Sequence, residues 1–334
     1  MWLPKKVYWS PQNIMIDITN NCNLHCIMCR PQILKTKSLV WSYLDFLFVV
    51  NHFSPRSISI GATGEPLLNK HISSMIHCLH KKRIKVILNT NGTLLKDFTE
   101  DWLQELDLIK ISIDAPNETV YKFIRQNENF LQLVDTVKKI TYLKKPRVRF
   151  EYVIMSQNYY EMSNFIKFCK ELKTTCFFRL FEGLQLQEQN VKDYMNVSEI
   201  EMELNKAQIV AKDLNVQTNL PDLCKKMQYV RQYYNREKIV DDRRKHICLL
   251  PWLQFFVRVD GETCPCCNLL ENDMFSVGNI FQISNVWNSQ KMIDLRCLFL
   301  KKKNYDLFST CAKCEFLYWK QLWQWTKLIP GWFK

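Results

Sequence analysis

The sequence lacks the segments that would export a protein or anchor it in a membrane. Residues 1–6 include Pro4 and two lysines, and they have no apolar core of the kind that a signal peptide needs. The longest apolar stretch, residues 39–53, is interrupted by Asp45 and His52 and is too short to span a bilayer. We therefore expect a cytoplasmic protein.

A basic arm is also missing, although the net charge is +13. The lysines and arginines are scattered in pairs along the chain, apart from the triplet 301–303, which indicates solvated helix faces. The excess still favours anionic partners, such as a phosphorylated substrate or an acidic membrane surface, and we do not expect nucleic acid. Fourteen cysteines in a cytosolic chain are better explained by metal or cluster ligands and buried thiols than by disulfides.

The order of the predicted elements indicates an α/β fold. Between residues 13 and 183, short β-branched runs alternate with longer stretches of helical period, as in parallel βα units. Six such units predict a partial (β/α)6 barrel. The predicted strands are 13–19, 57–62, 85–91, 108–114, 147–155 and 175–181, and the predicted helices are 36–51, 72–82, 98–106, 130–144 and 160–172.

The predicted strands alternate aliphatic and polar residues instead of being apolar throughout. Ile14, Ile16 and Ile18 share one face of the first strand, and Asp17 lies on the other. If the aliphatic faces pack under the helices, the polar faces line a binding cavity in the barrel. The alternative is an open antiparallel sheet with an exposed polar face, which the intervening helices argue against. The predicted lining residues are Asp17, Asn89, Ser112, Asp114, Arg149, Glu151 and Arg179.

Three cysteines, Cys22, Cys26 and Cys29, follow the first predicted strand directly. Three thiols can hold an iron–sulfur cube and leave one iron without a protein ligand, so that the iron can bind a substrate or cosubstrate. The alternative is a structural zinc site with His25 or a distant residue as the fourth ligand.

The CxxxCxxC string at residues 22–29 resembles the hallmark of the radical SAM superfamily. Many relatives have an aromatic residue before the third cysteine, where this chain has Met28. The resemblance implies that Cys22, Cys26 and Cys29 hold a catalytic [4Fe–4S] cluster, whose open iron binds S-adenosylmethionine (SAM). It further implies reductive cleavage of SAM to methionine and a 5′-deoxyadenosyl radical, with flavodoxin or ferredoxin as electron donor.

Several loops after later strands resemble the SAM-binding places of this family. Gly64-Glu65-Pro66 is similar to the family's GGEP motif with Thr63 at the first glycine, and residues 89–92 (NTNG) are similar to its TNG loop. Each string alone is an ordinary turn or helix cap, but their order along the barrel supports the resemblance. The cofactor-binding residues that it implies are Gly64, Glu65, Asn89, Asn91, Ser112, Asp114 and Arg125.

The C-terminal part resembles the SPASM and twitch cluster domains of the same family. The resemblance rests on a cysteine before Pro-Trp, an Asp-Gly hairpin, the strings GNI and VWNS, and a closing CxxC. It implies an auxiliary [4Fe–4S] cluster, in the single-cluster twitch form, on Cys248, Cys266, Cys311 and Cys314. Cys264 or Cys267 could replace Cys266, and a zinc ribbon is the alternative. The remaining thiols, which we expect to be buried, are Cys78, Cys169, Cys176, Cys224 and Cys297.

These features divide the chain into four parts. We expect a barrel core over residues 1–184, a helical connector over 185–245, an auxiliary cluster domain over 246–315, and an aromatic and basic tail over 316–334. In the connector, Pro221 separates helices predicted at 197–213 and 224–240. The tail could fold back as a lid, which is the commoner use of such a segment, or make a peripheral membrane contact.

The expected activity is that of a radical SAM oxidoreductase or modifying enzyme that abstracts a hydrogen atom from a substrate C–H bond. The auxiliary cluster would assist electron transfer. A small, anionic substrate is favoured, because only about a dozen residues precede the first strand and the charge is basic. The alternatives are a maturase of a ribosomally made peptide and, more distantly, a zinc-binding protein that binds nucleic acid. The candidate substrate contacts are Arg149, Glu151, Arg179 and Glu182.

Overall fold

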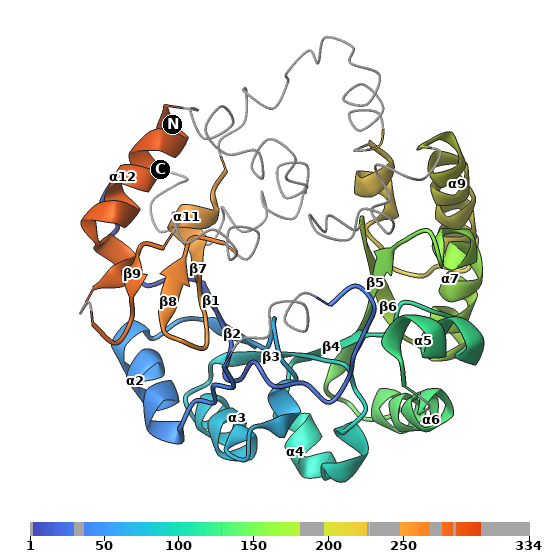
Figure 1. The fold of residues 1–334 in the computed structure, drawn as a ribbon, viewed down its shortest axis with the longest axis horizontal. Coiled ribbons are helices and arrows are strands. Elements are labelled where there is room, and N and C mark those ends of the chain that lie inside the picture. Colours follow the sequence, from blue (N-terminus) through green and yellow to red (C-terminus); the bar gives the residue numbers. More distant parts are fainter. Residues whose placement is uncertain are drawn as a thin grey trace.

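A computed structural model describes residues 3–29, 37–127, 129–180, 197–225, 227, 248–266, 276–282 and 285–301. Its nine strands form one sheet in the order β6-β5-β4-β3-β2-β1-β7-β8-β9. They are β1 (Asn13–Ile16), β2 (Ser57–Ile60), β3 (Lys85–Thr90), β4 (Leu108–Ser112), β5 (Arg147–Ile154), β6 (Thr175–Leu180), β7 (Gln254–Val257), β8 (Glu262–Cys264) and β9 (Gly278–Asn279). Figure 1 shows the sheet as an open arc with helices along its outer side.

The α/β fold and the partial barrel predicted from the sequence are confirmed. Strands β1 to β6 pair in parallel, each with the next along the chain, which excludes the antiparallel alternative. The predicted strands were too long at their carboxyl ends, since β1 ends at Ile16 and β4 at Ser112. The side chain of Asp17, the first residue beyond β1, accepts hydrogen bonds from the backbone amides of Ala62 and Thr63 in the loop after β2.

The helices are α2 (Tyr43–Phe53), α3 (Ile72–Lys81), α4 (Glu100–Gln104), α5 (Glu118–Arg125), α6 (Phe130–Thr141), α7 (Met162–Glu171), α9 (Val197–Asp213), α11 (Leu250–Leu253) and α12 (Gln290–Leu300). The predicted start of the first helix at residue 36 was wrong. Helix α2 starts after Ser42, whose side chain and that of Asp45 form a capping box, a device that stabilises a helix by about 1 kcal/mol. Helix α5 was not predicted, although Asn117 caps its start and its buried residues, Tyr121, Ile124 and Arg125, share one face.

The core lies between the sheet and the outer helices. Ile14, Ile16 and Ile18 are fully buried, as are the alternating residues Phe150 and Tyr152 of β5. Burying a side chain of this size stabilises a fold by about 1.5–3 kcal/mol. The aliphatic faces therefore pack under the helices, as the alternation predicted, and the opposite faces of the strands are left to line the barrel.

The C-terminal segment extends the barrel sheet instead of forming a separate one. Strand β7 pairs in parallel with β1, with Gln254 opposite Asn13, and then turns back through the β7–β8 hairpin. The hairpin was predicted, whereas the pairing with β1 was not. Gly261, at the turn, has φ +88°, a backbone conformation that favours glycine.

The N-terminal residues are tied to this C-terminal segment by side-chain hydrogen bonds. The indole of Trp252 donates to the Pro4 carbonyl (2.7 Å), and that of Trp287 donates to the Trp9 carbonyl (2.9 Å). Arg296, fully buried, donates to the carbonyls of Lys5, Pro251 and Trp287. The two ends of the described chain thus stabilise each other.

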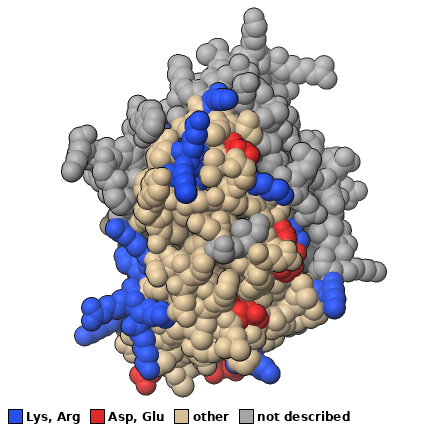
Figure 2. Space-filling view, turned by 90° about the vertical axis from the view of Figure 1, so that its left-hand side faces the viewer, with Lys and Arg blue, Asp and Glu red and all other residues tan. Residues whose placement is uncertain are grey.

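The surface reflects the basic composition. On the face with α2 and α12, Lys and Arg outnumber Asp and Glu and are spread from one end to the other (Figure 2). No helix within the described ranges has both the length and the apolar character needed to cross a bilayer.

Candidate active site

The three predicted cluster cysteines lie in one loop beyond the carboxyl end of β1, where barrel enzymes place their chemistry. None forms a disulfide; Cys26 is buried, and Cys22 and Cys29 are half-buried. The amide of Cys29 donates to the carbonyl of Cys26 (3.0 Å), which folds the last four residues into a tight turn. The Ile27 amide donates to the Ile124 carbonyl and fixes the loop on α5.

Two side chains from later parts of the chain, one in the loop after β3 and one in helix α5, contact the thiols. Asn91 Nδ2 lies 3.9 Å from Cys22 Sγ, and Arg125 Nη1 lies 3.6 Å from Cys26 Sγ. Burial raises the pKa of Cys22, and the charges of Glu65 and Cys26 raise it further. The thiol of Cys22 therefore stays protonated at neutral pH, and binding to a metal would release its proton.

The loop after β2 packs directly against the cysteine loop. A Cβ added to Gly64 would lie 2.4 Å from the Thr19 carbonyl oxygen and 2.7 Å from that of Asn21. Only glycine allows this approach, and it brings the Glu65 amide to the Asn21 carbonyl (2.8 Å).

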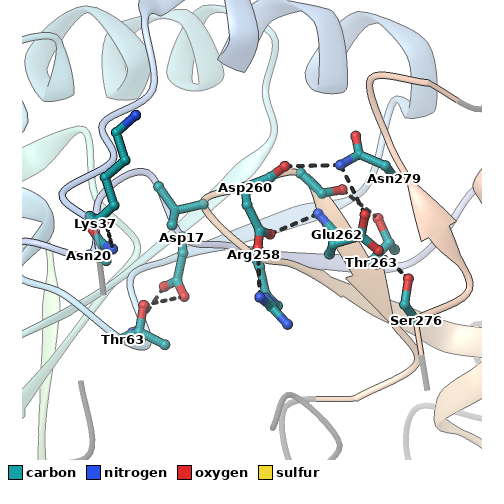
Figure 3. Close-up of polar contacts among 12 residues, drawn as sticks. Asp17, Asn20, Lys37, Thr63, Arg258, Asp260, Glu262, Thr263, Ser276 and Asn279 are labelled. Atoms are coloured by element: carbon teal, nitrogen blue, oxygen red, sulfur yellow. Dashed lines mark hydrogen bonds and ion pairs between the residues drawn. The ribbon is translucent and has the colours of Figure 1, made fainter. Parts of the chain in front are cut away.

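Thr63 occupies the place of the first glycine of the GGEP motif, and the structure shows what its side chain does. Its hydroxyl donates to Asp17 (2.6 Å), which also accepts from the Ala62 and Thr63 amides. Figure 3 shows Asp17 and Thr63 facing each other beside Arg258 of the β7–β8 hairpin. Burial raises the pKa of Asp17 to about 6, although these hydrogen bonds and Arg258 oppose the shift.

Glu65 is almost fully buried, and its carboxylate bonds to the protein. One oxygen accepts from the Leu67 amide and the Thr90 hydroxyl, and the other accepts from the Asn91 amide (2.7 Å). Burial raises the pKa of Glu65 to about 6 against these bonds. The carboxylate thus joins the loops after β2 and β3, and its predicted contact with SAM stays a prediction.

The asparagines of the loop after β3 also hold neighbouring loops. Asn89 Nδ2 donates to the carbonyls of Ile60 and Gly61, at the end of β2. Asn91 Nδ2 donates to the Asn23 side chain (2.8 Å), inside the cysteine loop. Sequence reasoning missed Asn23, although its place between two of the cysteines was a signal.

The residues after β4 form a buried ion pair. Asp114 has φ +57° and no exposed surface, and it pairs with Arg125 of α5. Its other carboxylate oxygen accepts from the Val153 amide (2.6 Å). Burial raises the pKa of Asp114 although Arg125 opposes this shift. Ser112, half-buried at the end of β4, lies on the side of the sheet that lines the barrel.

The predicted substrate residues meet in the barrel. Arg149 donates twice to Glu151 (2.6 and 2.8 Å), and Arg179 Nε lies 3.5 Å from the other oxygen of Glu151. Both guanidinium groups also lie over the Phe177 ring. Although burial opposes it, Arg149, Arg179 and Lys110 lower the pKa of Glu151, which therefore stays charged. Glu182 lies outside the described residues.

The auxiliary ligands are described only in part. Cys248 and Cys266 are half-buried, and Cys264 of β8 is buried opposite Phe256. Cys267, Cys311 and Cys314 lie outside the described residues, so the predicted ligand set stays a prediction. The described ranges contain no group of three or more His, Cys, Asp or Glu side chains that could hold a single metal ion.

The residues around Cys26 fit a cluster better than a single zinc ion. In a cluster each iron takes one thiolate, so three sulfurs need not surround a common point as they do around zinc. Two buried donors beside Cys26, the Tyr121 hydroxyl and Arg125 Nε, have no hydrogen-bond partner among the described residues. Buried donors of this kind suit the sulfide acceptors of a cluster.

Comparison with known proteins agrees with this geometry. Residues 16–169 match the model of the radical SAM superfamily, and residues 248–315 match that of the SPASM iron–sulfur cluster-binding domain. The chain belongs to the radical SAM superfamily. The predicted cofactors, a [4Fe–4S] cluster with SAM and an iron–sulfur centre in the SPASM domain, follow from that membership. The alternative of a zinc-binding, non-enzymatic protein was wrong.

The names of the relatives of this radical SAM enzyme refer to different activities. A tungsten-containing aldehyde ferredoxin oxidoreductase cofactor-modifying protein of Pyrococcus furiosus is 24% identical over 329 residues, which are 90% of this chain and 86% of that protein. A probable GTP 3′,8-cyclase of Methanocaldococcus jannaschii is 27% identical over 199 residues. That match spans 58% of this chain and 66% of the relative, so the whole relative's activity is not carried over.

Among solved structures, SuiB of Streptococcus suis bound to S-adenosylmethionine superposes with a TM-score of 0.63 at 16% identity. The match covers 93% of this radical SAM chain and 70% of SuiB. At this identity the likeness establishes a shared fold and leaves the reaction open.

Proposed function

We propose that this radical SAM enzyme abstracts a hydrogen atom from a small anionic substrate held in the barrel. The observation that carries the proposal is the positive charge inside the barrel. Lys110, Arg149 and Arg179 surround the carboxylate of Glu151 there. Guanidinium groups bind carboxylate and phosphate groups through paired, charge-assisted hydrogen bonds, so two arginines at this place suit an anionic substrate. The name of the M. jannaschii relative, a cyclase of GTP, supports a substrate of this kind.

The bound cluster and SAM would supply an electron and a 5′-deoxyadenosyl radical, and the chain's own residues would supply position. Cys22, Cys26 and Cys29 would hold the cluster, and Arg125 and Asn91 would direct hydrogen bonds at its cysteine sulfurs. The loops of Gly64 and Asn89, with Ser112 and Asp114, would orient SAM. Arg149 and Arg179 would bind the anionic group of the substrate, and the SPASM cluster would carry an electron to or from it. A cytosolic location belongs to the same proposal, because the cluster thiols must stay reduced.

The first test is anaerobic reconstitution of the full chain. We expect about eight irons per chain if both sites hold [4Fe–4S] clusters, together with reductant-dependent release of 5′-deoxyadenosine. Cys26→Ala and Cys29→Ala should each abolish that release, whereas Cys78→Ala should not. Release that survives both substitutions would remove the basis of the proposal.

The second test concerns the substrate. Small phosphorylated or carboxylated compounds, their neutral analogues and short peptides would be compared for stimulation of 5′-deoxyadenosine release. Arg179→Gln should raise KM for the anionic substrate at least about tenfold, while the matched change Arg147→Gln, at the opposite end of the barrel, should not. Stimulation by neutral compounds alone would contradict the proposal.

A peptide substrate is the alternative. SuiB has also been solved bound to its precursor peptide SuiA, and it shares the present fold with a TM-score of 0.64. If peptides alone stimulate 5′-deoxyadenosine release in the same comparison, the enzyme is a peptide maturase.

A further inference from the structure

A cavity of about 400 Å³ opens at the amino ends of β4, β5 and β6, opposite the end that carries the cysteine loop. Leu108, Arg147 and Thr175, the first residues of these strands, line it. Its volume lies within the range of small-molecule sites. We refer to it as the basal cavity. Its position separates it from the proposed catalytic chemistry.

The charged residues that line the basal cavity are all basic: Lys144, Arg147, Arg149 and Lys173. Arg149 is engaged by Glu151 (2.6 Å). Within the described part of the chain, no carboxylate pairs with the other three, and Lys173 only lies over the Tyr142 ring (4.4 Å). Asp107, which precedes the lining residue Leu108, is paired with Lys145 instead (3.0 Å).

The uncharged lining supplies the other parts of a binding site. Thr175, Gln217 and Thr218 add hydrogen-bonding groups, and Leu108, Val148 and Cys176 add apolar surface. Residue 217 is held there because its carbonyl accepts from the Cys176 amide (3.1 Å). Three cations that pair with no carboxylate of the described residues, beside hydroxyl and amide donors, match the oxygen-rich surface of a phosphate group.

We propose that the basal cavity binds a small phosphate-bearing anion. The shared chemistry is a di- or triphosphate group, which could belong to free pyrophosphate or to a nucleotide. The basal cavity shares Arg149 with the barrel lumen, but its other cations, Lys144, Arg147 and Lys173, have no part in the function proposed above.

The test uses the full chain without a reconstituted cluster, in reducing buffer near 0.15 M salt, titrated calorimetrically with pyrophosphate and with ATP. Arg147→Glu is matched by Lys85→Glu, because both residues are exposed and begin a strand. Lys173→Asn is matched by Arg83→Asn, because both residues are exposed and have left-handed backbones, at φ +53° and +56°. The cavity variants should weaken binding at least about tenfold, and the matched controls should change it by less than about twofold.

Equal binding of pyrophosphate and ATP would support recognition of the phosphates alone, and binding of ATP only would support a nucleotide site. Three results would overturn the proposal: no saturable binding of either probe, equal losses in the cavity variants and their controls, or a loss in Arg179→Gln without one in Arg147→Glu. The last result would place the anion in the barrel lumen.

Discussion

At the scale of single residues, Arg125 links the acidic residue after β4 to the cysteine loop. Its guanidinium pairs with Asp114 through one nitrogen and approaches Cys26 Sγ through another. Both charged residues are buried, so each depends on the other for stability in the folded protein. Removing one partner of a buried pair costs more than removing both.

This dependence predicts the outcome of a double-mutant cycle on the cluster-free protein. Arg125→Met should lower the free energy of unfolding by about 3–5 kcal/mol, because it leaves the Asp114 charge unpaired. Asp114→Asn added to Arg125→Met should restore part of that loss. Anaerobic urea unfolding measures the free energy of unfolding of each variant. Lys122→Met, on the exposed face of α5, is the control. If Arg125→Met lowers the free energy of unfolding no more than Lys122→Met does, the ion pair contributes little to stability.

Asp17 predicts a pH dependence. Its pKa is raised from 3.8 to about 6 in the folded protein, so between these values the folded state binds more protons than the unfolded state. Its contribution to stability is therefore complete below pH 3.8 and is lost as the pH rises through 6, by up to about 3 kcal/mol. Glu65, also raised to about 6, acts in the same direction.

Asp17→Asn should remove Asp17's share of this dependence, because the amide keeps the hydrogen bonds with Ala62 and Thr63 and carries no charge. We expect the variant to be more stable than the wild type at pH 7 and to lose less stability between pH 4.5 and 7. Unfolding at the two pH values checks this. If the stability of the wild type and of Asp17→Asn depends equally on pH, the buried charge of Asp17 does not cause this dependence.

At the scale of elements, the site depends on how closely loops approach one another. The loops after β1, β2 and β3 touch through Gly64, the Glu65 carboxylate and the Asn91 side chain. Each loop follows a parallel strand, so all three emerge at the same edge of the sheet. Shortening or bending one of them would move the others.

Gly64→Ala tests this closeness. The added Cβ meets backbone atoms, which cannot move aside without shifting the cysteine loop. We expect reconstituted iron on the Cys22–Cys29 loop to fall by at least about half, with the SPASM iron unchanged. Ala62→Ser, at an exposed position two residues earlier, is the control. Full iron content in Gly64→Ala would show that the loops can separate at little cost.

At the scale of the whole molecule, the C-terminal segment completes the sheet. Strand β7 covers the edge of β1 that would otherwise expose its hydrogen-bonding groups. The Gln12 amide donates to the Leu253 carbonyl (2.7 Å), and the Asp17 amide donates to the Val257 carbonyl (2.9 Å). Two indoles also join the N-terminal residues to this segment: that of Trp9 donates to the Trp252 carbonyl, and that of Trp252 donates to the Pro4 carbonyl.

This arrangement predicts that the barrel does not fold well alone. A chain ending at residue 245 should aggregate or lose secondary structure, because β1 becomes an open edge and its apolar neighbours lose cover. A chain ending at residue 315, which keeps β7, β8 and α12, should remain monodisperse. Size-exclusion chromatography and circular dichroism compare them. A well-folded shorter chain would show that the C-terminal part is an independent addition.

The sequence alone determined most of the elements and the position of the cysteine loop, because both depend on local patterns. Alternation in strands such as β5, and the spacing of Cys22, Cys26 and Cys29, are visible over a few residues. Their placement next to the carboxyl end of β1 follows from order along the chain. The same local information failed for α5 and for the starts of helices such as α2, where a cap decides the boundary.

Only the tertiary structure decided which distant residues meet. Arg125 reaches Cys26 across 99 positions, and Trp9 donates to the Trp252 carbonyl across 243. The pairing of β7 with β1, and the basal cavity formed by three strand ends, have no local signal either. Such contacts depend on how all the elements pack at once, because a parallel sheet brings together residues that the chain keeps far apart.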